Sequence, residues 1–295
     1  MPSTATILRM VVMGGLSVIG ALESRKRSMT KYDMSITKPV DTVSIIVPSY
    51  NETLFIEQCL NSLANQSIIR KYPEYFEILV VDSGSTDGTI QQVLDFIGNR
   101  NVNGLDGYNI SGLDNGSFNN IRLIMAPRGK LTARNLGTDI AKGNIIVSTD
   151  ADMFCPDSWL ANLLYSFQSD KVQHKNIVGT FGHTIYSPMI LTSLTEVDNI
   201  FFHKNRMVGN NCAYYKYAFY TVGEFDDSID QSVWSKVNKE EEIDFGNRLS
   251  NMGHIIYNNG AVAYHLGEDK FYCRIRGDCN NSQGMSKLSS LYANR

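Results

Sequence analysis

The stretch from Asn144 to Asp152 reads N-I-I-V-S-T-D-A-D, an apolar, β-branched run that ends in two aspartates. Such a run favours a buried strand, with Asp150 and Asp152 just beyond its carboxyl end. Open α/β sheets place their ligand sites at that end of the strands. Two carboxylates separated by one small residue can share Mg²⁺ or Mn²⁺, which takes further oxygens from phosphates. An ordinary solvated turn is the alternative, because aspartate favours turns.

The same pattern of strand, turn and helix precedes this stretch. Apolar strands are predicted at residues 43–47, 76–81 and 121–125, and helices at residues 54–63, 89–96 and 131–141. Strands that alternate with helices predict an α/β fold with a mostly parallel, Rossmann-like central sheet and flanking helices. Right-handed crossovers would then bring Asp82, which ends the second strand, to the same edge of the sheet as Asp150.

The second half of the chain has a different pattern and predicts a smaller subregion. It contains a probable helix at 159–167, strands at 177–181 and 261–265, and an acidic helix from Glu240. We therefore divide the chain into an N-terminal apolar segment with a basic linker (1–40), a main domain (41–270) and a tail (271–295). Within the main domain we separate residues 41–153 from residues 154–270, and the loop at 99–120 is predicted to be an insertion or a mobile element.

Composition narrows the class of protein. The chain has 295 residues with a net charge of −3, so no basic surface argues for nucleic acid as a partner. Its five cysteines form no C-x-x-C pair, which disfavours a zinc knuckle or a disulfide framework. Free thiols are typical of a reducing compartment, so we expect a cytoplasmic protein.

The N-terminal segment suggests contact with a membrane. Residues 10–22 are largely apolar and are followed by Arg25, Lys26 and Arg27, but the run is shorter than the ~20 residues that span a bilayer. A short helix packed on the domain or lying in a membrane interface is one interpretation, and a span or signal anchor is the other. We expect peripheral association with the cytoplasmic face through residues 7–27.

Two polar turns could hold a charged ligand between them. Asp82 begins D-S-G-S-T-D-G-T, a compact turn in which its carboxylate could accept a hydrogen bond from a base or ribose. Lys130 and Arg134 lie four residues apart at the start of a predicted helix, so they can face the same way. Cations there would offset the charge of a diphosphate. An ordinary turn and a solvated loop are the alternatives.

These motifs, in order, resemble a known family. V-P-S-Y-N-E (47–52), V-D-S-G-S-T-D-G-T (81–89), A-R-N-L-G (133–137) and T-D-A-D (149–152) resemble the nucleotide-binding half of family 2 glycosyltransferases of the GT-A fold. The segment at 209–227, which ends in a Gly-x-Phe-Asp turn, resembles the acceptor side of that family. E-E-E-I-D-F-G (240–246) resembles its general-base segment, and A-V-A-Y-H (261–265) resembles the strand that carries a histidine near the metal.

The resemblance implies a donor site and a metal site. The residues that it places around the nucleotide sugar are Pro48, Tyr50, Glu52, Asp82, Ser85, Lys130, Arg134, Asp150, Arg274 and Arg276. Asp152 would bind Mn²⁺ or Mg²⁺ directly, Asp150 would approach both ribose and metal, and His265 would be a third ligand or a diphosphate contact. Arg274 and Arg276 would close over the diphosphate, although they could equally lie on a free tail.

The expected general base departs from the family pattern, because Glu242 stands where the family usually has aspartate. With Phe245 and Leu249 on the buried face of this helix, Glu241 and Glu242 both fall within about 60° of that face. The choice between Glu242 and Glu241 stays open. Acids also favour a helix N-terminus for electrostatic reasons alone, which is the simpler interpretation of this cluster.

The function that follows from the resemblance is sugar transfer with inversion. The donor would be a nucleotide-diphosphate sugar, with UDP favoured over GDP and dTDP, and the acceptor a hydroxyl of a glycan or of a lipid- or protein-linked group. A catalytically inactive scaffold is one alternative. A sugar-nucleotide pyrophosphorylase is another, but the first loop, P-S-Y-N-E, lacks the glycine cluster expected of one.

Overall fold

The computed structural model describes residues 38–102, 120–173, 175–186, 207, 209–229 and 240–266. The chain divides into two compact units after Thr37, and every described residue belongs to the second. Our expectations for residues 7–27, for most of the 99–120 loop and for Arg274 and Arg276 therefore lie outside the described residues. Among the helices described, none has the length and apolarity needed to cross a membrane.

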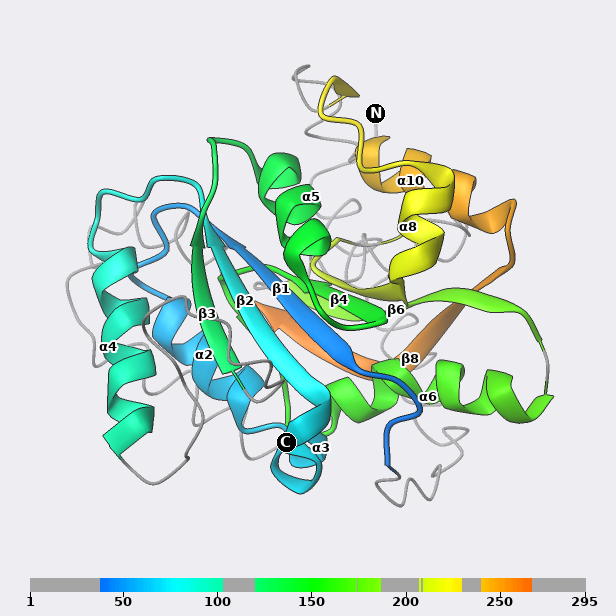
Figure 1. Ribbon diagram of the computed structural model, residues 1–295, viewed down its shortest axis with the longest axis horizontal. Helices are drawn as coiled ribbons and strands as arrows, with labels where there is room; N and C mark the ends of the chain where they lie inside the picture. Colours follow the sequence, from blue (N-terminus) through cyan, green and yellow to red (C-terminus); the bar gives the residue numbers. More distant parts are fainter. Residues whose placement is uncertain are drawn as a thin grey trace, which may run out of the picture. The chain divides into compact units, whose positions relative to one another are not determined.

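One eight-stranded sheet runs through the described part of the second unit, in the order β3-β2-β1-β4-β7-β6-β8-β5 (Figure 1). The strands are β1 (Val43–Ser49), β2 (Phe76–Asp82), β3 (Asn120–Met125), β4 (Ile145–Thr149), β5 (Met153–Phe154), β6 (Ile177–Tyr186), β7 (Asn211–Tyr215) and β8 (His254–His265). β1 pairs in parallel with β2 and β4, and β2 pairs in parallel with β3. The predicted parallel sheet is thus confirmed for the first half of the chain.

The second half continues the same sheet with mixed directions. β7 lies antiparallel between β4 and β6, and β6 pairs in parallel with β8. β8 begins at His254, well before the predicted start at 261. A register shift opposite Gly182 and His183 interrupts β8 near a polar stretch, Asn258 to Gly260, which hid its first half from a reading of the apolar pattern.

Helices flank the sheet, and Figure 1 shows α5 lying over β1. They are α2 (Ile56–Ala64), α3 (Ser67–Lys71), α4 (Thr89–Val102), α5 (Lys130–Ile140), α6 (Trp159–Gln173), α8 (Lys216–Val222), α10 (Glu240–Ser250) and the 3₁₀ helix η1 (Pro73–Tyr75). The helices predicted after β1, β2, β3 and β4 and from Glu240 are all present. The short α3 and η1 were not predicted, because elements of one turn carry no readable periodicity.

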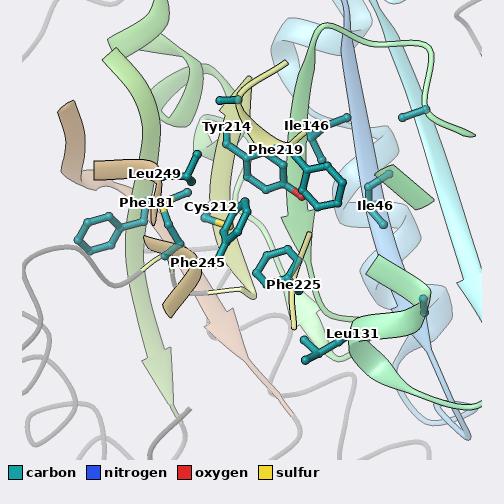
Figure 2. Packing of buried hydrophobic residues seen from close by; sticks show 14 of the residues in the cluster. Ile46, Leu131, Ile146, Phe181, Cys212, Tyr214, Phe219, Phe225, Phe245 and Leu249 are labelled. Atoms are coloured by element: carbon teal, nitrogen blue, oxygen red, sulfur yellow. The ribbon is translucent and has the colours of Figure 1, made fainter. Parts of the chain in front are cut away.

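A buried cluster joins the two halves of the sheet (Figure 2). Ile46 of β1 and Leu131 of α5 contribute from the first half, and Tyr214, Phe225 and Phe245 from the second. The rings of Phe225 and Phe245 lie 4.2 Å apart, and those of Tyr214 and Phe245 lie 5.2 Å apart. Because this cluster spans both halves, helix α5 and the acidic helix α10 share one apolar core.

Candidate active site

The carboxyl ends of β1, β2 and β4 meet at one edge of the sheet, as predicted. Ser49 at the end of β1 lies opposite Asp82 at the end of β2, and Asp150 follows the last residue of β4. The loops after β1 and β2 are bound to each other. The N–H of Asn51 donates to Oγ of Ser85 at 2.8 Å, and Oδ1 of Asn51 accepts from the N–H of Thr86 at 2.9 Å. These two loops therefore form one preassembled surface.

Asp82 is fully buried and holds the turn after β2 together. Its carboxylate accepts hydrogen bonds from the hydroxyls of Ser49 (2.7 Å) and Ser85 (2.6 Å) and from the N–H groups of Gly84 (3.0 Å) and Ser85 (2.7 Å). Because four hydrogen-bond donors of the protein bind it, this carboxylate stabilises the turn after β2, a role that the sequence did not reveal. Its contact with a base or ribose stays a prediction, as does that of Ser85.

The end of β1 and the loop after it carry three more of the predicted nucleotide contacts, Pro48, Tyr50 and Glu52. Pro48 is buried within β1, while the ring of Tyr50 is exposed and lies 4.7 Å from the guanidinium carbon of Arg128. Glu52 is half-buried, and its N–H donates to Oγ1 of Thr89 at 2.8 Å. Tyr50 thus offers an accessible aromatic face at this edge of the sheet.

Asp150 is bound by both predicted cations. Its Oδ1 lies 2.9 Å from Nη2 of Arg134, and its Oδ2 lies 2.7 Å from Nζ of Lys130. Burial alone would raise the pKa of Asp150, but the charges of Lys130 and Arg134 outweigh it and hold the pKa well below its usual range. Asp150 is therefore an anion whose charge is already compensated by two neighbours. The prediction that Lys130 and Arg134 face the same way is confirmed.

Arg134 is almost completely buried, at 1 % exposure. Its guanidinium lies over the ring of Phe225 at 5.9 Å, and a Cβ added to Gly209 would lie 2.6 Å from Cζ of Arg134. Burial by itself would lower the pKa of Arg134. The negative charge of Asp150, and to a lesser extent that of Glu242, outweighs burial, so the net shift of the pKa is upward. An arginine this buried acts through the carboxylates that it holds, and Arg134 lies within electrostatic reach of both Asp150 and Glu242.

Asp150, Asp152 and His265 form a group that could hold a metal ion. Each offers one ligand atom, and these atoms lie within 4.8 Å of one another. Nε2 of His265 lies 3.7 Å from Oδ1 of Asp152. The pairing of β5 with β8 sets Met153 opposite His265, and the N–H of Leu266 donates to the carbonyl of Asp152 at 2.8 Å. The sequence therefore predicted correctly that these three residues lie together.

The chemistry of this group fits the predicted ion. Carboxylate oxygens suit Mg²⁺ and Mn²⁺, and imidazole is a common additional ligand for transition metals. Ligand atoms about 2.1 Å from an ion are at most about 4.2 Å apart, so only a small adjustment would close the group around one. Because Arg134 and Lys130 engage both oxygens of Asp150, Asp152 and His265 are the residues better placed to ligate directly.

The two candidate bases point inward from the first turn of α10. Glu242 is 2 % exposed and Glu241 is 9 % exposed, while Phe245 and Leu249 on the same helix are fully buried. This confirms the inward face that the helical periodicity predicted. Glu242 raises the pKa of Arg134, so its carboxylate lies within electrostatic reach of that guanidinium. Which of the two glutamates acts as base stays a prediction.

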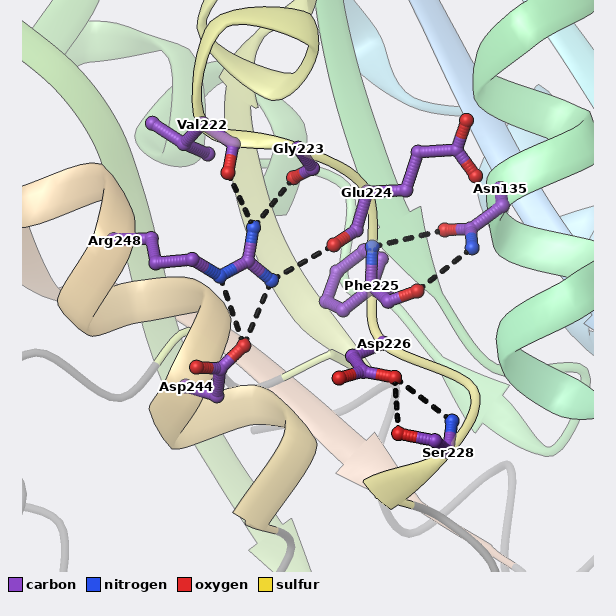
Figure 3. A network of polar contacts seen from close by, with 9 residues as sticks. All are labelled: Asn135, Val222, Gly223, Glu224, Phe225, Asp226, Ser228, Asp244 and Arg248. Carbon is purple, nitrogen blue, oxygen red and sulfur yellow. Dashed lines mark hydrogen bonds and ion pairs between the residues drawn. The ribbon is translucent and has the colours of Figure 1, made fainter.

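Three further residues organise this site, and the contacts described here were not all predicted from the sequence: Gly209, Asn135 and Arg248. Gly209 leaves room for the guanidinium of Arg134. Asn135 binds the backbone of Phe225, and Arg248 binds Asp244, at 2.8 Å between Nη2 and Oδ2, together with backbone carbonyls (Figure 3). Asp244 and Arg248 are four residues apart, a spacing that favours an ion pair on a helix, but no local signal could show the backbone groups that Arg248 also binds.

Comparisons with known proteins agree with this arrangement. Residues 44–219 match the family described as Glycosyl transferase family 2. Glycosyltransferase AglE of Haloferax volcanii is 30 % identical over 128 residues, which cover 42 % of this chain and 35 % of that protein. A protein of Methanococcus voltae, dolichyl N-acetyl-alpha-D-glucosaminyl phosphate 3-beta-D-2,3-diacetamido-2,3-dideoxy-beta-D-glucuronosyltransferase, is 25 % identical over 209 residues, 69 % of this chain and 56 % of its own length.

A solved structure supports the same fold. Mannosyltransferase PcManGT from Pyrobaculum calidifontis, in complex with GDP-Man and Mn²⁺, matches with a TM-score of 0.55 at 20 % identity, over 88 % of this chain and 67 % of that one. The chain spans only 35 % and 56 % of the two curated relatives described above. Since the family match covers more than half of the sequence, the chain belongs to glycosyl transferase family 2 and has the GT-A fold.

Proposed function

We propose that this protein transfers a sugar, with inversion, from a nucleotide-diphosphate sugar to an acceptor hydroxyl in a reaction that depends on Mn²⁺ or Mg²⁺. The observation that carries the proposal is the convergence of three features. The first is the group formed by Asp150, Asp152 and His265, and the second is the exposed Tyr50, which follows the neighbouring strand β1. The third is the pair of inward-facing glutamates of α10. Membership of a glycosyltransferase family supports the reaction class.

The base would be Glu242, with Glu241 as the second candidate. Its carboxylate takes the proton of the acceptor hydroxyl while the acceptor oxygen forms a bond to the anomeric carbon. The bond from that carbon to the diphosphate oxygen breaks on the opposite face, and the nucleoside diphosphate leaves with the electron pair. A general base of this kind contributes about 10²–10⁴-fold to the rate.

The leaving diphosphate carries negative charge that the donor side must balance. Lys130 is half exposed and reaches Oδ2 of Asp150, so its ammonium can turn toward a phosphate oxygen without leaving this edge of the sheet. Asp152 and His265 would hold the metal, which when bound neutralises charge on the diphosphate. Arg134 keeps Asp150 ionised and fixed in place.

The donor and acceptor are proposed more coarsely. We favour a UDP-sugar, with GDP- and dTDP-sugars as the alternatives, and a glycan or a lipid-linked group as acceptor. The relative from Methanococcus voltae is named for a dolichyl phosphate-linked acceptor, and the structural neighbour holds GDP-Man, so both nucleotides belong in the test. An acceptor on a lipid would agree with the predicted membrane association of residues 7–27.

A thermal-shift panel of UDP-, GDP- and dTDP-sugars, each with and without Mn²⁺, tests the donor site. We expect one nucleotide class to raise the melting temperature, and only with the metal present. Asp152→Asn should abolish this metal-dependent shift. No stabilisation by any nucleotide sugar would contradict the proposal and favour the scaffold alternative.

Turnover of the selected donor, with water in place of the acceptor, then tests the base. Glu242→Gln should lower this hydrolysis by at least 100-fold and leave the nucleotide-induced thermal shift unchanged, because the amide cannot take a proton. Glu241→Gln is the matched control from the same helical turn. Loss of turnover in Glu241→Gln alone would transfer the role to Glu241, and full activity in both variants would refute a glutamate base on α10.

A further inference from the structure

The loop that follows α8 is held by one arginine of α10. Nη1 of Arg248 donates to the carbonyls of Val222 (2.8 Å) and Gly223 (2.6 Å), and Nη2 donates to the carbonyl of Glu224 (2.7 Å). Val222 is the last residue of α8, and Gly223 turns the chain with φ +88°. The final carbonyls of a helix lack partners within it, so Arg248 closes the C-terminal end of α8 from a neighbouring helix.

The same loop is bound from the opposite side by α5. Asn135 donates from Nδ2 to the carbonyl of Phe225 at 2.9 Å, and its Oδ1 accepts from the N–H of Phe225 at 3.2 Å. Figure 3 shows Arg248 and Asn135 on either side of the segment from Val222 to Phe225. We call this segment the bridging loop, because it connects the donor-side helix with the helix that carries the candidate bases.

Side-chain packing follows the same path as the polar contacts. The ring of Phe225 lies 4.2 Å from the ring of Phe245 on α10 and 5.9 Å from the guanidinium carbon of Arg134 on α5. Arg134 in turn holds Asp150 at 2.9 Å. An unbroken series of contacts therefore runs from the metal-side aspartate, through the bridging loop, to α10.

We propose that Arg248 is a positioning residue, which sets the place of Glu242 relative to the donor side by fastening α10 to the bridging loop. The proposal rests on the function proposed above. Arg248 lies about 9 Å from Glu242 along the helix axis, at 1.5 Å per residue, so it acts through the position of α10 rather than on the reacting atoms. A displacement of about 1 Å at a reacting group can lower a rate by about 100-fold.

Two substitutions separate the two sets of contacts that Arg248 makes. Arg248→Lys keeps a cation beside Asp244 but replaces the planar fork, which reaches three carbonyls, with a single ammonium. Asp244→Asn removes the ion pair and leaves the guanidinium free to hold the carbonyls. The proposal assigns the effect on catalysis to the carbonyl contacts alone.

The experiment measures hydrolysis of the nucleotide sugar selected by the thermal-shift panel, with Mn²⁺, in the full chain. We expect Arg248→Lys to lower kcat at least 10-fold with the KM for the donor unchanged within twofold, and Asp244→Asn to stay within threefold of wild type in both. Arg248→Lys with wild-type kcat, or equal losses in the two variants, would overturn the proposal. A merely structural role would lower the melting temperature and the active fraction, but not kcat per folded molecule.

A variant on the other side of the loop guards against a failure to fold. Asn135→Asp removes the N–H donor to the carbonyl of Phe225, so it should also lower kcat at least 10-fold at unchanged KM. Wild-type kcat in Asn135→Asp would overturn the proposal even if Arg248→Lys could not be purified. If Glu242→Gln and Glu241→Gln both hydrolyse the donor as fast as wild type, the proposed glutamate base itself fails. If Glu242→Gln is 100-fold slower than wild type while Arg248→Lys equals wild type, only the positioning role fails.

Discussion

Replacement of Arg134 by Met should destabilise the protein by about 2–4 kcal/mol. Removing one partner of a buried ion pair typically costs about 3–5 kcal/mol, because the other charge stays buried without compensation. Arg134 and Asp150 have side-chain exposures of 1 % and 9 %, so this regime applies to them. Lys130 still contacts Asp150, but its side chain is 50 % exposed, and such a pair returns at most about 1 kcal/mol.

Urea unfolding at pH 7, followed by circular dichroism, measures this loss. The double variant Arg134→Met with Asp150→Asn should recover about 1–3 kcal/mol relative to Arg134→Met, because the stranded carboxylate is then neutral. Lys130→Met is the matched control and should cost about 1 kcal/mol or less, a loss that added salt reduces. A cost below 1 kcal/mol for Arg134→Met, or strict additivity in the double variant, would refute the reasoning.

Two further substitutions test other parts of the site. Gly209→Ala should destabilise the protein by about 1–3 kcal/mol in the same assay, because the new Cβ would overlap the buried guanidinium of Arg134; stability equal to wild type would show that Arg134 moves freely. Burial raises the pKa of Asp87, but hydrogen bonds from Thr53 and Thr89 outweigh it and lower the pKa to about 2 from an ordinary 3.8. The stability that these hydrogen bonds give is therefore complete above about pH 4 and is lost as the pH falls toward 2. In urea titrations, Asp87→Asn should lose less stability than wild type between about pH 5 and pH 2.5. Equal losses would contradict the lowered pKa of Asp87.

Most of the features that the sequence predicted correctly depend on local periodicity. Alternating apolar strands and helices placed Asp82 and Asp150 at one edge of the sheet, and helical spacing turned Glu241 and Glu242 inward. The order of the family motifs along the chain predicted that His265 lies near Asp152, although no local pattern links the two residues. The predictions for the sheet edge and for α10 hold because strand and helix periods fix the direction of a side chain once the burial of its neighbours is known.

The features that the sequence did not reveal depend on contacts between distant segments. Arginine is rarely buried, and nothing in A-R-N-L-G showed that the guanidinium of Arg134 packs against Gly209 and the ring of Phe225. The saturation of Asp82 by hydrogen bonds depends on Ser49 from another strand. In the same way, the antiparallel β7 lies between β4 and β6 because of pairings that a single strand sequence cannot specify.

The pairing of β5 with the end of β8 also has a consequence for biosynthesis. β5 consists only of Met153 and Phe154, and its partner strand is the last one that the structure describes. A nascent chain emerges N-terminal end first. The group of Asp152 and His265 therefore cannot form until β8 has been synthesised and has joined the sheet. An ion that binds both residues would stabilise chains that include β8 and not shorter ones. Such an ion would then favour the survival of chains in which β8 has joined the sheet, before any substrate is bound.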